Sequence, residues 1–239
     1  MLKRNITIYS TIAILLVVSI ICVQRINSTP VPISVMAQYS TKLPTIIIDA
    51  GHGGVDGGSS GIDGTVEKDI NLSIALMLRD TLEFYGFETI MIREEDKSIH
   101  SEGANTIREK KVSDLHNRLN IINSTENCVF VSIHQNYFEQ TQYSGTQVFY
   151  SPNNPESKAM AEIMQKTIVN MLQNDNSRQI KQAGKTLYLL NNAKKPAIMI
   201  ECGFMSNEKE LALLKSEEYQ QQMALSITNG ILKYMESVG

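Results

Sequence analysis

Short apolar runs of four to seven residues alternate along this chain with longer segments in which apolar side chains recur every three or four positions. The short runs are typical of strands buried on both faces of a sheet, and the longer segments are typical of helices with one buried face. Alternation of the two favours parallel pairing, because each helix carries the chain back across the sheet. The pattern therefore predicts an α/β fold: a single domain with a largely parallel central sheet and helices on both faces. We predict strands over Thr45–Asp49, Phe87–Ile92, Cys128–His134, Gly145–Tyr150, Leu187–Leu190 and Ala197–Glu201, and helices over Asp69–Tyr85, Val112–Ile122, Ser157–Leu172 and Glu217–Glu236.

The beginning of the chain carries a different pattern. Lys3 and Arg4 precede the apolar run Ile6–Val23, which is interrupted only by Thr, Ser and Tyr. Positive charge followed by an apolar run predicts that residues 1–27 are a signal peptide or an N-terminal membrane anchor. Residues 28–44 contain three prolines among polar neighbours, which predicts a linker. The domain over residues 45–239 is then expected outside the cytoplasm, either secreted or tied to the membrane through the N-terminal segment alone.

Composition excludes several classes of protein. With 42% apolar residues, 20% charged residues and a net charge of −3, the chain is neither disordered nor a general nucleic-acid binder. Its three cysteines are too few for a disulfide scaffold. Cys128 and Cys202 sit at the edges of strand-like runs, and buried apolar packing is the better interpretation of both, although an exported pair of thiols could oxidise.

Two histidines and a glutamate stand at the ends of predicted strands. His52 follows the run TIIIDAG, His134 ends CVFVSIH, and Glu201 ends AIMIE. Because the carboxyl ends of parallel strands gather along one edge, we expect the three side chains to converge. Two imidazoles and a carboxylate, with one position open to water, are a common ligand set for catalytic zinc. Glu67, in the loop before the next helix, is the natural third ligand and Glu201 the general base, but position alone allows the two glutamates to exchange roles.

The glycine-rich loop 51–58 points to another class of protein. Such a loop between a strand and a helix often cradles phosphate, but this one has neither the G-x-G-x-x-G spacing nor the lysine of a P-loop. A phosphate- or nucleotide-binding protein therefore stays a weaker alternative to a metallohydrolase.

The metal interpretation also has a plain alternative, because a histidine at a strand end is more often an ordinary polar residue than a metal ligand.

Four sequence blocks resemble those of a known family. Ile46–Gly54 (IIIDAGHGG), Glu67 with the following KDINL, Ser132–Asn136 (SIHQN) and Ile200–Asn207 (IECGFMSN) occur in the order found in zinc-dependent N-acetylmuramoyl-L-alanine amidases of the amidase_3 type. The resemblance implies one α/β domain that acts on peptidoglycan and cuts the amide between the lactyl group of muramic acid and the first L-alanine of the stem peptide. A non-catalytic wall-binding module of the same fold is the alternative.

The resemblance also assigns roles to individual residues. By motif, His52, Glu67 and His134 would ligate Zn²⁺, and Glu201 would be the catalytic carboxylate. Asn136, in the block of His134, would bind substrate. The ambiguity between the two glutamates is thus decided by resemblance and not by physics.

The chain has a polar insertion between Arg93 and Arg118, and this arrangement is similar to that in the germination-specific amidases of spore-formers (the CwlD type). Those enzymes act on the spore cortex to prepare its muramic-δ-lactam. The chain also contains no wall-binding repeats. Arg118 is expected either to fix the substrate or the geometry of the site, or to be a surface residue of a helix. An exposed metal site beside a polar insertion leaves room for an accessory secreted protein that orders the site.

Overall fold

The computed structural model of the protein describes residues 43–238. The expected signal or anchor (1–27) and all but the last two residues of the expected linker (28–44) lie outside the described residues. Within residues 43–238, no helix combines the length and the apolar character that crossing a membrane requires.

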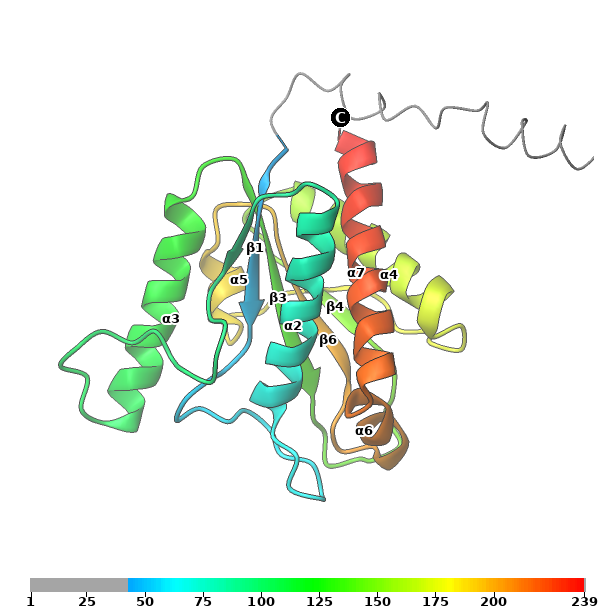
Figure 1. Ribbon diagram of the computed structural model, residues 1–239, viewed down its shortest axis with the longest axis horizontal. Helices are drawn as coiled ribbons and strands as arrows, with labels where there is room; N and C mark the ends of the chain where they lie inside the picture. Colours follow the sequence, from blue (N-terminus) through cyan, green and yellow to red (C-terminus); the bar gives the residue numbers. More distant parts are fainter. Residues whose placement is uncertain (1–42, 239) are drawn as a thin grey trace, which may run out of the picture. The chain divides into compact units, whose positions relative to one another are not determined.

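Six strands form one sheet in the order β2-β1-β3-β6-β4-β5. The first four of these run parallel to one another, whereas β4 is antiparallel to β6 and parallel to β5. In Figure 1 the arrows of β1 and β3 point the same way, so their carboxyl ends share the lower edge of the sheet. The predicted fold class is confirmed. The strands are β1 (Thr45–Ala50), β2 (Thr89–Met91), β3 (Cys128–Asn136), β4 (Gln147–Tyr150), β5 (Lys181–Gln182) and β6 (Ala197–Phe204).

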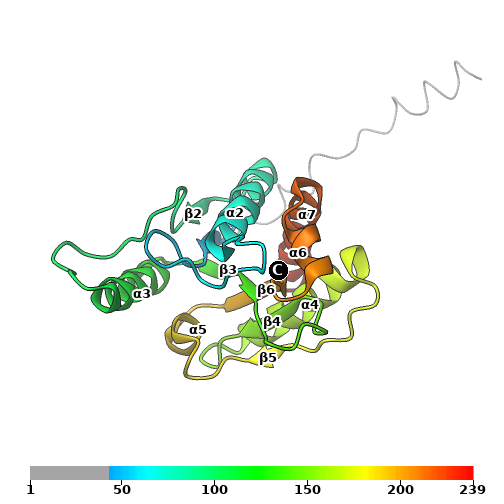
Figure 2. The ribbon, with the colours of Figure 1, turned by 90° about the horizontal axis from the view of Figure 1, so that it is seen from below.

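Helices cover both faces of the sheet because neighbouring strand residues point to opposite sides. Ile46 and Ile48 of β1 belong to a core beneath α2, α4 and α7, while Ile47 belongs to a second core with residues of α3 and α5. Figure 2, seen from below, shows α2 and α7 on one side of the strands and α5 on the other. The helices are α2 (Glu67–Phe84), α3 (Ile107–Ser124), α4 (Glu156–Leu172), α5 (Tyr188–Asn192), α6 (Glu208–Leu214) and α7 (Glu217–Val238).

One predicted strand is wrong. Leu187–Leu190 contributes to the short helix α5, and it packs Leu189 and Leu190 into the second core. A run of four apolar residues is too short for its periodicity to distinguish a strand from one turn of a buried helix.

Helix α3 begins at Ile107, five residues before its predicted start at Val112. A capping box explains the difference: the Thr106 hydroxyl accepts from the Glu109 amide at 3.2 Å, and the Glu109 carboxylate accepts from the Thr106 amide at 3.0 Å. The polar insertion is therefore partly helical, and it carries the first turn of α3 toward the carboxyl edge of the sheet.

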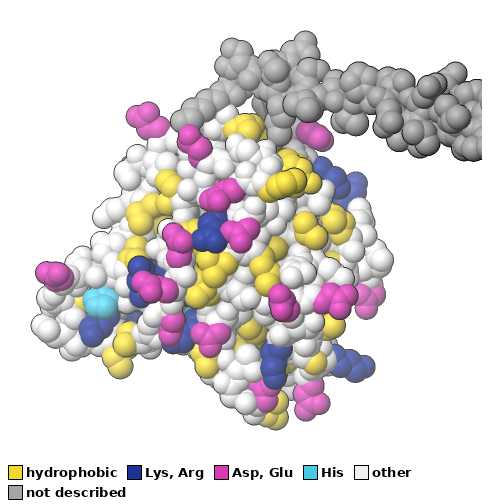
Figure 3. Space-filling model, viewed as in Figure 1, with side chains coloured by type: hydrophobic (Ala, Val, Ile, Leu, Met, Phe, Trp, Pro, Cys, Tyr) yellow, Lys and Arg dark blue, Asp and Glu magenta, His cyan; other side chains and the backbone are white. Residues whose placement is uncertain are grey.

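Cys128 and Cys202 are both free thiols and both buried. Cys128 lies in the core on the α3 side of the sheet, and Cys202 lies in the core on the α2 side. The interpretation of both as buried apolar residues is confirmed. On the surface in view in Figure 3, acidic and basic side chains are interspersed and form no large area of one sign.

Candidate metal centre

Three ligand-type side chains converge at the carboxyl edge of the sheet. Glu67 Oε1 lies 3.2 Å from His52 Nε2 and 3.0 Å from His134 Nδ1. One ligand atom from each of the three residues can be chosen so that all lie within 4.8 Å of one another. The two histidines expected to converge from the strand ends thus lie together, with Glu67 between them.

His134 and Glu201 are neighbours in the sheet. They are register partners across β3 and β6, and both strands continue past them, to Asn136 and Phe204, so neither residue ends its strand as we expected. Glu201 Oε2 is buried and has no hydrogen-bond partner among the described residues. Burial raises the pKa of Glu201 to about 7, a shift that the nearby charge of His134 opposes. The site therefore contains one buried carboxylate oxygen that no group of residues 43–238 satisfies.

Glu67 is the first residue of α2, not a loop residue as expected. Its Oε1 accepts from the Gln135 amide at 3.1 Å and from Asn71 Nδ2 at 3.2 Å, and its Oε2 accepts from the Ser59 amide at 2.8 Å. Burial would raise the pKa of Glu67, but hydrogen bonds from His134 and His52 hold it well below its usual range. Glu67 is therefore an ionised carboxylate at the centre of the cluster.

His52 lies outside the sheet, on a backbone with φ of 63°. Its Nδ1 is hydrogen-bonded to Asp56 Oδ2 at 2.9 Å, and Asp56 in turn pairs with Lys111 of α3 at 2.7 Å. Burial disfavours the charged imidazole, but Asp56 and Glu67 raise the pKa of His52 to about 9. A carboxylate on one ring nitrogen leaves the other facing the cluster, which is the usual arrangement around a metal-bound histidine.

Arg118 is buried, with 2% of its surface exposed, so its interpretation as a surface residue is wrong. Its guanidinium pairs with Asp49 and with Asp114 (2.6 Å), and it donates to the carbonyls of His52 at 2.8 Å and Ala50 at 3.2 Å. Each of its three side-chain nitrogens is used, which favours the expected role in the geometry of the site over substrate binding.

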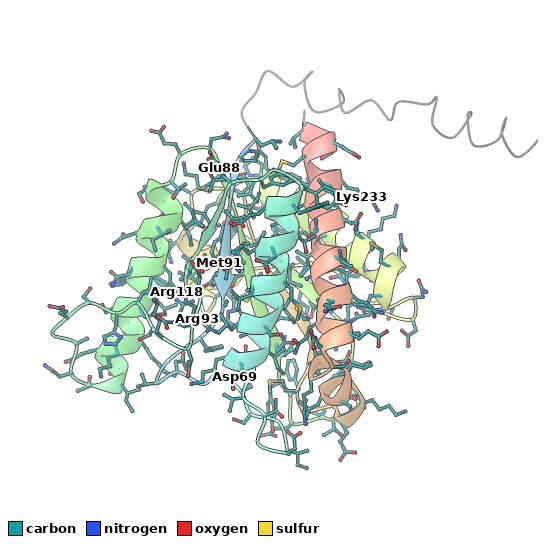
Figure 4. All side chains as sticks on the ribbon, viewed as in Figure 1. Asp69, Glu88, Met91, Arg93, Arg118 and Lys233 are labelled. Carbon is teal, nitrogen blue, oxygen red and sulfur yellow. The ribbon has the colours of Figure 1, made fainter. Side chains whose placement is uncertain are left out.

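Arg93 is a second arginine that binds backbone carbonyls beside the site, and we did not single it out in the sequence. Its Nε donates to the Ala50 carbonyl at 2.8 Å, and its Nη2 donates to the carbonyls of Gly51 (3.0 Å) and Lys68 (2.8 Å). Figure 4 shows Arg93 and Arg118 close together near the lower end of β1. Two buried guanidinium groups thus hold the three carbonyls that lead into the histidine loop.

Two glycines leave the space that the cluster needs. A Cβ atom at Gly51 would run into the ring of His134, and one at Gly58 would lie 2.5 Å from Glu67 Oε2 and 2.7 Å from His52 Cδ2. Gly58 also has a φ of 72°, which disfavours any larger residue. Two imidazoles and one ionised carboxylate within this space fit a zinc ion.

The loop 51–58 is not shaped to bind phosphate. The amides of Gly53 and Asp56 donate to each other's carbonyls, Gly54 donates to Asp96 at 2.7 Å, and Gly51 donates to Ile133 at 3.0 Å. An anion site at such a loop needs free amides that converge. The structure therefore disfavours the phosphate-binding alternative.

The sequence pattern of the family described as N-acetylmuramoyl-L-alanine amidase matches residues 46–233. The chain belongs to this family. It is 37% identical over 194 residues to the germination-specific N-acetylmuramoyl-L-alanine amidase of Bacillus subtilis (strain 168), and the match covers 81% of each chain.

Solved structures of similar proteins have the same fold as this amidase. The CwlD amidase from Clostridioides difficile, in complex with the GerS lipoprotein, is 43% identical with a TM-score of 0.78, over 81% of this chain and 99% of that one. The N-acetylmuramoyl-L-alanine amidase from Clostridium difficile 630 is 30% identical with a TM-score of 0.72, over 83% of this chain and all of the other. The resemblance stated from the sequence blocks is thereby confirmed.

Asn136 lies at the same edge of the amidase, two residues beyond His134, and is partly buried. Its side-chain oxygen accepts from the Tyr137 amide at 2.9 Å, and its carbonyl accepts from Met205. Both bonds are made within the protein, and neither tests substrate binding, so a substrate-binding role for Asn136 stays a prediction. Asp56, which is hydrogen-bonded to His52, was not singled out in the sequence. The only signal for it there was its position four residues after His52.

Proposed function

We propose that this amidase hydrolyses, with zinc, the amide between the lactyl group of N-acetylmuramic acid and the L-alanine of the stem peptide in peptidoglycan. One observation carries the proposal. His52, Glu67 and His134 meet at one point, and the unpartnered carboxylate of Glu201 lies across the sheet register from His134. Three ligands beside a free carboxylate are what metal-assisted hydrolysis of an amide requires.

The three converging residues would hold the zinc ion through imidazole nitrogens and a carboxylate oxygen. Zinc supplies Lewis acidity at such a site: it polarises a carbonyl and makes water more acidic. Asp56 fixes the ring of His52, and the amides of Ser59 and Gln135 fix the carboxylate of Glu67. The protein therefore sets the orientation of the ligands before any substrate arrives.

Glu201 would move the proton. Its carboxylate accepts a proton from the attacking water as the water oxygen bonds to the lactyl carbonyl carbon. It then gives that proton to the alanine nitrogen as the C–N bond breaks, which leaves a lactyl carboxylate and a free amine. A pKa of about 7 suits a group that must accept and then donate near neutral pH.

The test is mass spectrometry of peptidoglycan fragments after incubation with zinc-loaded protein, in parallel with Glu201→Gln and with Glu162→Gln, a change on the exposed face of α4. We expect Glu201→Gln to keep its zinc and to lose roughly a hundredfold to ten-thousandfold in rate. Glu162→Gln should match the wild type. Equal rates for all three proteins would remove Glu201 from the chemistry. Glycan binding without cleavage by the wild type would support a wall-binding module.

We further propose that the substrate is spore-cortex peptidoglycan, where removal of the peptide precedes formation of muramic-δ-lactam. Support comes from the germination-specific relative, which is 37% identical. Export through residues 1–27, with the protein secreted or anchored in the forespore or cortex space, belongs to the same proposal. Spores without this chain should contain no muramic-δ-lactam in their cortex, and a normal lactam content would contradict the assignment.

An accessory secreted protein is the partner that we propose beside peptidoglycan. The similar CwlD amidase from Clostridioides difficile is found in complex with a lipoprotein, which supports the idea. Activity of the purified chain should then rise when a secreted lipoprotein from the same organism is added. Full activity of the chain alone would remove the reason for proposing a partner.

A further inference from the structure

A pocket of about 180 Å³ opens beside the two imidazoles. The loop after β1 forms one wall, α3 forms the opposite wall, and Leu189 of α5 contributes to the lining. His52 and His134 both line it, so a molecule in this pocket lies next to the candidate metal centre. The pocket is therefore placed to hold a part of the substrate close to the bond that is cut.

Most charged side chains in the pocket already have partners. Asp49 and Asp114 both pair with Arg118, and Asp56 pairs with Lys111 and with His52. These groups neutralise one another and offer little to a ligand.

Lys110 is the exception. Its side chain lines the pocket and is partly buried, and its ammonium group makes no ion pair or hydrogen bond with any residue between 43 and 238. An ammonium group without a partner, on a side chain that lines a pocket, is a favourable place for an anion, because a carboxylate can accept a charge-assisted hydrogen bond from it.

Part of the remaining lining is aliphatic, and the hydroxyl of Ser98, which also lines the pocket, is already hydrogen-bonded to His100 at 2.5 Å. Val55, Leu115 and Leu189 contribute aliphatic side chains to the same pocket, and Leu189 is buried. One unpaired cation beside aliphatic walls fits a carboxylate on a short aliphatic skeleton, such as an acidic amino acid. It does not fit a sugar ring, which needs several hydrogen-bonding groups around it.

We propose that this pocket binds a carboxylate of the stem peptide, with Lys110 as a residue that determines substrate specificity; this inference rests on the proposed function. In a muramoyl peptide the lactyl carboxyl group is already part of the amide to be cut, so every free carboxylate belongs to the peptide. The acidic residue next to the first alanine is the nearest of these to the scissile bond. The glycan would then lie on the other side of the metal centre.

The experiment uses two synthetic muramoyl peptides that differ in one group. The first is N-acetylmuramoyl-L-alanyl-γ-D-glutamyl-L-lysine, and the second carries D-isoglutamine in place of D-glutamate, so that a carboxamide replaces the carboxylate. Values of kcat/KM are measured with the zinc-loaded full chain. The variants are Lys110→Met, Lys110→Arg and the control Lys158→Met, which changes an exposed lysine of α4.

We expect the wild type to prefer the carboxylate substrate by roughly tenfold to a hundredfold, as for a hydrogen bond to a charged group. Lys110→Met should lose this preference while keeping its zinc and its activity on the carboxamide, and Lys110→Arg should recover part of it. Lys158→Met should behave as the wild type. Equal cleavage of both substrates by the wild type, or an unchanged preference in Lys110→Met, overturns the subsite alone. Cleavage of neither substrate, with and without the secreted lipoprotein proposed above as a partner, overturns the proposed function and the subsite with it.

Discussion

His134 and His52 belong to the same candidate site, but the chain holds them in different ways. His134 lies within β3, which is hydrogen-bonded to β1 on one side and to β6 on the other. His52 lies in a loop with left-handed backbone, where side chains of α3 and the insertion hold it in place. We refer to His134 and Glu201 as the sheet side of the site and to loop 51–58 as the loop side.

The difference shows which parts of the site depend on particular side chains. A ladder of backbone hydrogen bonds is available to almost any sequence, so the sheet side keeps its geometry when a neighbouring side chain changes. The loop side depends on a few buried charged groups, each of which is costly to leave unpaired. Substitutions and metal removal should therefore disturb the loop side first.

The largest effect is expected from Arg118→Met. The change leaves the buried carboxylates of Asp49 and Asp114 without their partner, and breaking such a pair costs about 3–5 kcal/mol in the free energy of unfolding. Urea unfolding followed by circular dichroism measures the loss. Ser132→Ala, which removes a single hydrogen bond to Asp49, is the control and should cost about 1 kcal/mol. Similar losses for the two variants would mean that Arg118 does not anchor the loop.

The next effect concerns zinc affinity. Asp56→Asn removes the charge that orients His52, and loss of such an outer partner weakens metal binding by about tenfold to a hundredfold. Competition with a chromophoric chelator gives the Kd. The control is Asp63→Asn, an exposed aspartate paired with Lys215, which should leave the Kd unchanged. If the two variants bind zinc equally well, Asp56 has no part in holding His52.

Removal of zinc should separate the two sides directly. At a free zinc concentration about ten times the Kd for zinc, metal binding stabilises the closed state of the site. Local openings that release the metal then become about tenfold rarer. In hydrogen exchange followed by mass spectrometry, amides of the loop side should exchange about tenfold faster after chelation, for the same reason. Amides of β3 and β6 should not change. An equal response on both sides would contradict the distinction between them.

The smallest effect is expected from Lys111→Met. Lys111 is about half exposed, so its pair with Asp56 is screened by water, and Asp56 keeps its bond to His52. We expect the Kd for zinc to rise only about twofold, in line with a surface ion pair. The chelator competition used for Asp56→Asn measures it. A loss as large as that of Asp56→Asn would show that Lys111, and not Asp56 alone, fixes the imidazole.

Most of the fold was predictable because the buried strands and the helical stripes are long enough to show their periods. The failures have local causes. Leu187–Leu190 is too short to show a period, and the start of α3 depends on the capping box of Thr106 and Glu109, which stands in the sequence but was not used. Helix α6 was missed in the same way, since Asn207 caps it by accepting from the amides of Lys209 and Glu210.

The sheet side of the site was more predictable than the loop side. Parallel strands bring His134 and Glu201 to one edge whatever the details of packing, so topology alone finds them. The partners of His52 could not be found in this way. Arg93 and Arg118 are far apart in sequence from the carbonyls that they bind, and nothing in their own neighbourhood indicates that they are buried. A charged residue that turns inward is visible only when the whole fold is known.

The two buried thiols make it possible to time the opening of each face of the sheet separately. Burial raises the pKa of both Cys128 and Cys202, so each thiol reacts with a disulfide reagent only when the layer around it opens. Cys128 lies beneath α3 and α5, and Cys202 lies in the core of α2, α4 and α7. With Cys22 replaced by serine, the reaction rates of Cys128 and Cys202 could be compared in the same protein. The thiol that reacts faster would show which layer of helices opens first.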